Sequence, residues 1–207
     1  MLTVLVANIK GGCGKTTTAT HLAAAFAGAR LTTALADGDR QRSSLRWLEA
    51  RPQGAAPIAG LDWVKGPGKA PKVDRLVVDA PAAMRMGGLE ELIAAADVVV
   101  VPMLPSVFDE QSTTRLLGKV EALKPVRRGK TSLGLLANRL RARSKAAARL
   151  EAFVADLDHE VVARIPDRAV YADAALEGLT VFDIAGARGA QLRADWLPLV
   201  RFCEAHA

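Results

Sequence analysis

The sequence predicts an α/β fold in which a doubly wound, mostly parallel sheet carries helices on both faces. Short apolar runs alternate with longer helical stretches along most of the 207 residues. These runs are continuously apolar, which is typical of parallel strands buried on both faces. Half of the residues are hydrophobic and few are aromatic, so we expect one core of Val, Leu, Ile and Ala. This length favours a single domain over residues 1–207.

The first elements are a strand and the helix that follows it. Residues 3–8 read TVLVAN, an apolar and β-branched run that predicts a buried strand. Residues 15–29 predict a helix, because Leu22 and Phe26 lie four residues apart on one face. Further strands are expected at residues 33–36, 61–64, 75–79, 98–101, 133–137 and 160–165. Further helices are expected at residues 43–50, 89–96, 109–123 and 144–156.

Two stretches are expected to be less regular. Residues 51–72 are rich in Pro and Gly, and we interpret them as a surface connection within the domain. Residues 187–207 carry apolar residues at helical spacing, but Pro198 should kink this helix or start a new turn.

Thiol chemistry and membrane insertion are not expected. Cys13 and Cys203 lie at opposite ends of the chain and form neither a CxxC pair nor a disulfide framework. The chain has no signal-peptide pattern at its start and no apolar run of membrane-spanning length, so we expect a cytoplasmic protein. His21 is expected to pack on its helix or to face solvent, and no histidine spacing indicates a metal site.

A glycine-rich loop joins the first strand to the first helix. Residues 10–17 read KGGCGKTT, which deviates from the phosphate-loop pattern GxxxxGK[ST] because Ile9 stands at its first glycine position. Such a loop points successive backbone N–H groups at phosphate oxygens, and the helix begins there with its positive end. An ordinary turn gives no reason for Lys, Thr and Thr to follow the glycines. The expected nucleotide-binding residues are Gly11, Gly12, Cys13, Gly14, Lys15, Thr16 and Thr17.

This loop and several later segments resemble the ParA/MinD family of deviant Walker A ATPases, most of all the small ParA-type partitioning members. DGDRQ at residues 37–41 is similar to the family's DxDPQ segment, with Arg40 in place of proline. LVVDAP at residues 76–81 resembles its Walker B strand, with Ala82 in place of a second proline. Further resemblances are VP at 101–102 with PSVFD at 105–109, NR at 138–139 and IPDR at 165–168.

The resemblance implies an ATPase that uses ATP and Mg²⁺ and turns over slowly until a partner stimulates it. Phosphoryl transfer to water needs a lysine, a metal ion and a group that orients the water. The implied catalytic residues are Lys10, Lys15 and Asp39. Lys15 serves its own nucleotide, Asp39 orients the water, and Lys10 crosses to the partner's phosphates in a nucleotide-sandwich homodimer.

Metal and base contacts are implied in the same way. Thr16, Asp37 and Asp79 are expected around Mg²⁺, and Asn138 and Arg168 near the adenine. Carboxylates at strand ends are usually solvated caps. At the carboxyl ends of parallel strands beside a phosphate loop, however, they lie where α/β folds place ligands.

A basic zone suggests a polyanionic partner. The net charge is +6, and residues 119–149 contain ten basic residues and one acidic residue. A charge run is most often a solvated face, but part of this run falls at a strand-to-helix loop and is expected to have no acidic partners nearby. Non-specific DNA binding requires only phosphate contacts. The residues expected to contribute to it are Arg141, Arg143, Lys145 and Arg149.

Three functions remain open from the sequence. The first is a nucleoid-associated positioning ATPase, stimulated by a partner of the ParB type or by a cargo adaptor. The second is a MinD-like membrane switch that controls placement of division or of a surface structure, although residues 202–207 offer little apolar surface for an anchor. The third is a nucleotide-binding scaffold that no longer hydrolyses ATP, as the departures at Arg40 and Ala82 suggest.

Overall fold

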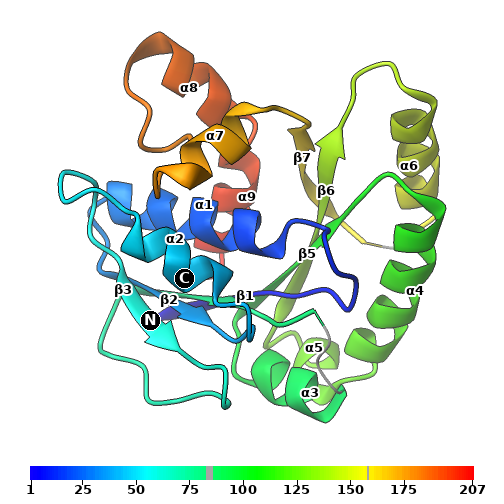
Figure 1. Cartoon of the computed structure of the whole chain (residues 1–207). Coiled ribbons are helices and arrows are strands. Elements are labelled where there is room, and N and C mark those ends of the chain that lie inside the picture. The colour runs from blue at the N-terminus through cyan, green and yellow to red at the C-terminus, as the bar shows by residue number, and fades with distance from the viewer. Residues whose placement is uncertain (83–85, 158) are drawn as a thin grey trace.

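The computed structural model describes residues 1–82, 86–157 and 159–207 and contains a seven-stranded sheet in the order β3-β2-β4-β1-β5-β6-β7 (Figure 1). Every strand pair in this sheet is parallel. The fold class is therefore confirmed, and the sheet is parallel throughout. The strands are β1 (Leu2–Val6), β2 (Thr33–Asp37), β3 (Ala59–Asp62), β4 (Arg75–Asp79), β5 (Val98–Met103), β6 (Ser132–Leu140) and β7 (Val161–Pro166).

Helices cover both faces of the sheet. Residues of β1 alternate between the faces, so that Val4 and Val6 pack with α1 while Leu5 packs with α3 and α4. On one face lie α1 (Lys15–Gly28), α2 (Ser43–Glu49), α7 (Val170–Leu176), α8 (Gly186–Ala194) and α9 (Leu197–Glu204). On the other lie α3 (Met86–Ala94), α4 (Val107–Glu121), α5 (Lys124–Arg127) and α6 (Lys145–Ala155). Two cores result, one on each face.

The register of the strands sets up the functional edge. In the β2–β4 pair Asp37 lies opposite Asp79, and in the β1–β4 pair Val6 lies opposite Asp79. The chain leaves β1 towards the glycine-rich loop at the same level. The phosphate loop and both carboxylates thus meet at the carboxyl edge of the sheet, as parallel topology requires.

Several elements differ from the sequence-based expectation. The short helices α5 and α7 were not expected, and β6 continues three residues further than predicted, to Leu140. Pro198 occupies the first turn of α9, so it starts a new helix, one of the two alternatives. None of the described helices has the length and apolar character needed to cross a bilayer.

Candidate nucleotide-binding site

The glycine-rich loop requires two of its glycines. Gly12 and Gly14 have φ angles of 78° and 97°, which side chains rarely tolerate. At Gly14 an added Cβ would also lie 2.1 Å from Nδ2 of Asn138. That amide group donates a hydrogen bond of 2.9 Å to the carbonyl of Cys13. The loop is therefore fastened to the end of β6, and only glycine fits beside the fastening.

Asn8 and Lys15 shape the interior of the loop. The side chain of Asn8 donates to the carbonyl of Pro102 at 2.8 Å and accepts from the backbone N–H of Lys10 at 3.0 Å. The buried Lys15 ammonium donates to the Lys10 carbonyl at 3.0 Å. Asn8 thus ties the loop to β5, a function that its place outside the phosphate-loop pattern did not reveal.

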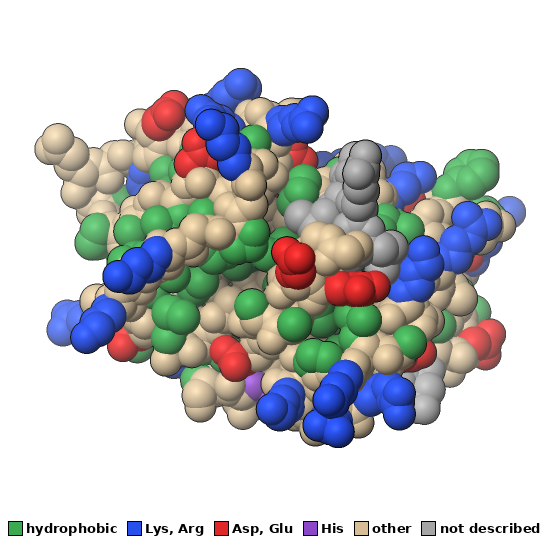
Figure 2. Space-filling view, turned by 90° about the horizontal axis from the view of Figure 1, so that it is seen from below, with side chains coloured by type: hydrophobic (Ala, Val, Ile, Leu, Met, Phe, Trp, Pro, Cys, Tyr) green, Lys and Arg blue, Asp and Glu red, His purple; other side chains and the backbone are tan. Residues whose placement is uncertain are grey.

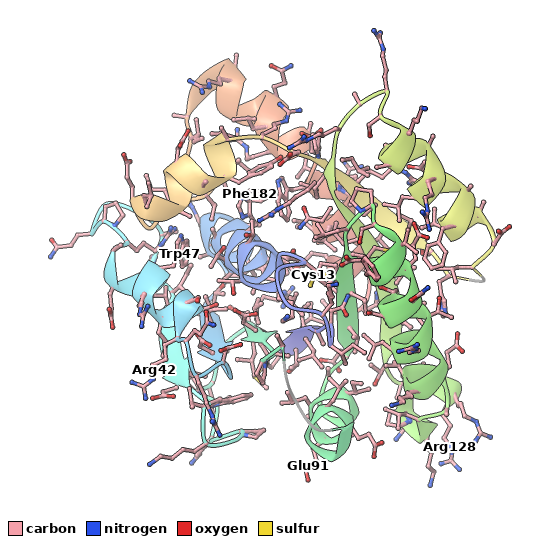
Figure 3. All side chains as sticks on the ribbon, turned by 45° about the vertical axis from the view of Figure 1, so that its right-hand side comes forward. Cys13, Arg42, Trp47, Glu91, Arg128 and Phe182 are labelled. Carbon is pink, nitrogen blue, oxygen red and sulfur yellow. The ribbon has the colours of Figure 1, made fainter. Side chains whose placement is uncertain are left out.

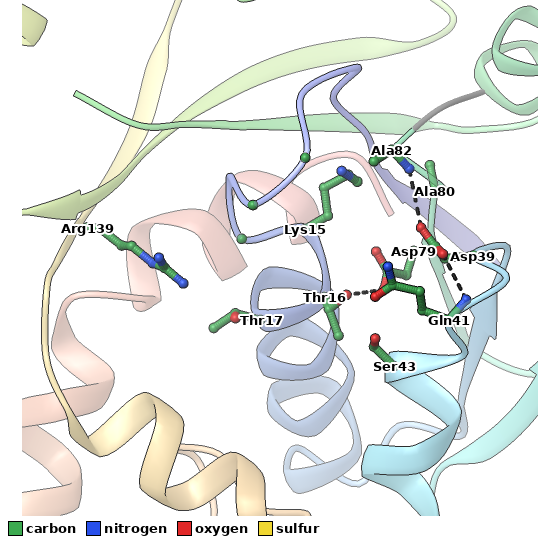
Figure 4. A pocket seen from close by; sticks show the side chains of 13 residues that line it. Lys15, Thr16, Thr17, Asp39, Gln41, Ser43, Asp79, Ala80, Ala82 and Arg139 are labelled. Carbon is green, nitrogen blue, oxygen red and sulfur yellow. Dashed lines mark hydrogen bonds between the residues drawn. The ribbon is translucent and has the colours of Figure 1, made fainter. Parts of the chain in front are cut away.

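A cavity of about 270 Å³ opens between this loop and the ends of β2 and β4 (Figure 4). Its walls are the loop backbone, the first turn of α1 and the segments that follow Asp37 and Asp79. The structure brings most of the expected phosphate-site residues together here. The lining residues are Gly11, Gly12, Gly14, Lys15, Thr16, Thr17, Asp39, Gln41, Ser43, Asp79, Ala80, Ala82 and Arg139.

Asp79 is the buried acceptor at the centre of the site. Its Oδ2 accepts hydrogen bonds from the hydroxyls of Thr16 at 2.7 Å and Ser44 at 2.6 Å. Burial raises the pKa of Asp79 to about 6, while the hydroxyls and Lys15 act in the opposite direction and Asp37 adds to the rise. A cation beside this carboxylate would offset the cost of burying its charge.

The residues present fit a magnesium ion. The hydroxyl of Thr16 and the carboxylate of Asp79 are oxygen ligands of the kind that Mg²⁺ prefers, with phosphate oxygens and water completing its shell. Among the described residues, no group of three or more His, Cys, Asp or Glu side chains could hold a metal ion. Thr16 and Asp79 would hold the ion together with phosphate oxygens of a bound nucleotide.

Asp37 is engaged by backbone groups. Its Oδ1 accepts from the N–H of Asp39 at 2.9 Å, and its Oδ2 accepts from those of Ser44 and Leu45 at 2.8 and 3.1 Å. These bonds satisfy N–H groups at the start of α2, which no intrahelical partner could reach. Asp37 therefore holds the segment that carries Asp39, and Ser44 links that segment to Asp79.

Asp39 lies half-buried on the wall of the cavity. Its Oδ1 accepts from the N–H of Gln41 at 2.9 Å, and its Oδ2 lies 3.4 Å from the N–H of Ala82 (Figure 4). Each oxygen keeps further acceptor capacity towards the cavity. A water molecule between this carboxylate and a bound phosphate could be oriented there.

Lys10 lies outside the cavity formed by its own loop. Its ammonium is 4.0 Å from Oδ2 of Asp109 and 5.6 Å from the ring centre of Phe108. Phe108 is 71% exposed and Asp109 is 2% exposed, so Lys10 reaches from the surface towards a buried carboxylate. Lys15 lines the cavity and Lys10 does not.

A second cavity of about 260 Å³ lies beyond Thr17, between the end of β6 and α7. Asn138 and Arg168 both line it, as expected for a base site. Arg168 also lies 2.8 Å from Oδ2 of Asp195. Arg139, the second residue of the NR segment that the sequence resemblance placed near the adenine, has a φ of 54° and lines both cavities.

The basic loop between β6 and α6 has more acidic contacts than its sequence suggested. Arg141 pairs with Asp167 at 2.9 Å, and Arg149 pairs with Glu110 at 2.7 Å. Both acids come from segments distant in sequence, so the expectation that this run lacks acidic neighbours was wrong for two of its four residues. Arg143 and Lys145 are exposed, and neither forms an ion pair within the described ranges.

His21, on α1 behind the phosphate loop, is buried in an aromatic cluster. Its ring stacks on Trp196 at 4.1 Å with planes 15° apart, and meets the ring of Tyr171 edge-on at 5.5 Å. Its Nδ1 bonds with the carbonyl of Thr17 at 2.8 Å. Burial lowers the pKa of His21 to about 4. Of the two placements expected for this residue, solvent exposure was wrong.

This histidine should make the fold sensitive to acid. Because the pKa of His21 is lower in the folded than in the unfolded chain, its contribution to the free energy of unfolding is fully present above about pH 6.5. This contribution is lost as the pH falls through 4. The loss is about 3 kcal/mol. The raised pKa of Asp79 changes stability in the opposite direction over an overlapping pH range. The stability of a His21 variant must therefore be compared with that of the wild type at each pH. We expect the stability of His21→Phe, measured by denaturant unfolding, to fall less than that of the wild type between pH 7 and pH 4. Parallel pH profiles would contradict this.

These features define a class of protein. The family model described as the CobQ/CobB/MinD/ParA nucleotide binding domain matches residues 4–181, and the chain belongs to this family. A relative from Halothiobacillus neapolitanus, the maintenance of carboxysome distribution protein A, is 31% identical over 200 residues, which cover 90% of this chain and 89% of the relative. The protein of the same description from Gloeobacter kilaueensis is 37% identical over 116 residues, or 51% of this chain and 50% of that protein.

Solved structures show the same fold. The match to the ATP complex of Cyanothece McdA has a TM-score of 0.78 at 17% identity, and it covers 100% of this chain and 97% of the McdA chain. The MinD cell division protein of Aquifex aeolicus has a TM-score of 0.76 at 17% identity, with coverage of 100% and 98%. The resemblance inferred from the motifs is thereby confirmed at the level of family and fold.

Proposed function

We propose that this protein is an ATP-hydrolysing partitioning protein that forms a nucleotide-sandwich dimer, binds nucleoid DNA non-specifically and positions a cargo. The observation that carries the proposal is the cavity in which Lys15, Thr16, Asp39 and Asp79 converge. The relatives named for carboxysome distribution favour a protein-cluster cargo over a plasmid or chromosome. The partner that stimulates hydrolysis is then an adaptor on that cargo.

The chain's own residues suffice to position the reaction. The loop N–H groups hold the phosphates, and the Lys15 ammonium exchanges the Lys10 carbonyl for phosphate oxygens. When bound, Mg²⁺ neutralises phosphate charge beside Thr16 and Asp79. Asp39 orients the attacking water. Hydrolysis by one chain alone stays slow, because Lys10 of that chain does not line its own cavity.

Lys10 is proposed to supply the missing cation across the dimer. Its side chain is 37% exposed and does not line its own cavity, which suits action on a neighbouring nucleotide. We expect Lys10→Ala to reduce steady-state hydrolysis by on the order of 100-fold. Its affinity for ATP, measured at chain concentrations too low for dimers, should not change. The control variant Lys69→Ala removes the same charge from an exposed lysine and should retain full activity.

Complementation between variants tests the trans role directly. When Lys10→Ala chains are mixed with Asp39→Ala chains, each mixed dimer has one intact site, with Asp39 from one chain and Lys10 from the other. Hydrolysis should therefore rise well above that of either variant alone. A mixture no more active than its components would show that Lys10 acts in its own chain or not at all.

The membrane alternative is less well supported. An amphipathic anchor requires an apolar face that is free to enter a bilayer. The last helix, α9, instead buries Leu199 and Cys203 in the core. Co-sedimentation with anionic vesicles, compared with DNA binding in the presence of ATP, separates the two proposals. A nucleoid pattern of the tagged protein in cells supports the first, and a membrane pattern the second.

A further inference from the structure

A cluster of exposed cations lies at the end of α4 and on and just after α5, away from the loop between β6 and α6. Six exposed cations fall within sixteen residues, and none of them forms an ion pair within the described ranges. The single acidic residue of this segment, Glu121, is paired with His159. We call this surface the α4–α5 basic patch. It comprises Arg115, Lys119, Lys124, Arg127, Arg128 and Lys130.

The backbone under the patch is firmly anchored. Leu123 and Val126 pack against the core formed with α3, α4 and α6, which leaves the charged side chains of α5 facing outwards. The N–H of Lys130 donates to the carbonyl of Pro125 at 2.9 Å. Thr131 then fastens the chain through a 2.9 Å hydrogen bond to the carbonyl of Ala96. The cations are thus presented by a preformed surface.

The patch differs from the loop between β6 and α6 in the availability of its charges. In that loop Arg141 and Arg149 already have carboxylate partners. In the patch, Arg128 projects from the outer edge of the molecule (Figure 3). Figure 2 views the side on which α3 and α5 lie, and Lys and Arg side chains gather along its lower edge. The electrostatic field of several neighbouring cations attracts a polyanion along the length of a surface rather than at one point.

The chemistry of the patch favours a nucleic-acid backbone over a bilayer. The exposed large hydrophobic side chains of the described residues are Met1, Ile9, Val107, Phe108, Leu176 and Leu197, and none lies between residues 111 and 130. Membrane-surface binding is strengthened by apolar side chains among the cations, which this surface does not offer within residues 111–130. Contacts to DNA phosphates need only the cations themselves.

We infer that the α4–α5 basic patch is the principal surface that contacts the phosphates of duplex DNA, ahead of the loop with Arg141, Arg143 and Lys145. This inference rests on the proposed function, since it assigns a place to the non-specific DNA binding proposed above. It also names no base-reading element, so binding should be independent of DNA sequence.

Two triple variants of equal charge test the assignment in the full chain. The first is Lys124→Ala, Arg127→Ala, Arg128→Ala in the patch, and the second is Arg141→Ala, Arg143→Ala, Lys145→Ala in the loop. Binding of a random-sequence duplex is measured by fluorescence anisotropy with Mg-ATP over a range of salt concentrations. Each lost phosphate contact makes the slope of log K against log salt less negative by about 0.9. We expect the slope for the patch variant to show the loss of about two to three phosphate contacts, and its affinity to fall at least tenfold. The loop variant should lose fewer contacts and less affinity.

The outcomes separate the assignment from the function. A patch variant with wild-type slope and affinity, beside a loop variant that binds poorly, overturns the assignment and leaves DNA binding intact. A wild-type chain that binds no duplex in any nucleotide state overturns both. Patch-dependent binding to phosphatidylglycerol vesicles without DNA binding also overturns both. Unchanged thermal unfolding and ATP affinity verify that the variants are folded, and the single variant Arg128→Glu replaces the triple one if they are not.

Discussion

Lys15→Ala is expected to weaken binding of Mg-ATP by at least about 100-fold and to abolish measurable hydrolysis. The Lys15 ammonium is buried within the glycine-rich loop, where it donates to the Lys10 carbonyl. A buried charge opposite phosphate oxygens forms charge-assisted hydrogen bonds, which are stronger than neutral ones. Equilibrium binding of a fluorescent ATP analogue measures the loss.

The control for this variant is Lys69→Ala, which removes the same charge from an exposed loop. It should bind the analogue as the wild type does. Far-ultraviolet circular dichroism of Lys15→Ala should match that of the wild type, because the loop keeps its ties through Asn8 and Asn138. Affinity within threefold of wild type in a folded Lys15→Ala protein would contradict the assignment.

Asp39→Ala is expected to lower the rate of hydrolysis by about 100- to 1000-fold, a range typical of a lost group that acts on the transition state. ATP affinity should change less than threefold, since Asp39 faces the cavity from the side opposite the loop. Asp39→Asn retains the acceptor for the N–H of Gln41 and isolates the role of the charge. It should be nearly as slow as the alanine variant.

The results also distinguish the enzyme from a non-hydrolysing scaffold. Turnover by the wild type that disappears in both Asp39 variants supports the enzyme. If the wild type releases no phosphate even as a dimer with its partner protein, the scaffold interpretation replaces it. If both variants hydrolyse ATP at the wild-type rate, another group orients the water.

The fold was predictable from sequence because local pattern and global topology agree. Each buried strand is a continuous apolar run. The glycine loop follows β1, and β2 and β4 end in Asp37 and Asp79. By contrast, α5 begins with a lysine and a proline inside a basic stretch, and its four residues carry too little periodicity to detect. The short α7 depends on packing against the first helix and the tail. Such packing has no local signature.

The identity of the site residues was predictable, but the connections between them were not. Motif order placed Lys15, Thr16 and Asp79 at one edge of the sheet. It did not reveal that Ser44 donates to Asp79 across thirty-five positions or that Asn138 holds the loop. Nor did it predict that Arg149 forms an ion pair with the carboxylate of Glu110. These are contacts between elements, and only the assembled sheet and helices define them.

Calorimetric titration of the purified chain with ATP, with and without Mg²⁺, tests the central claim most directly. The cavity formed by the glycine-rich loop, Thr16 and Asp79 predicts one ATP bound per chain, with an affinity that rises when magnesium is present. No detectable binding of ATP or ADP at millimolar concentration, in a chain whose fold is verified, would contradict it.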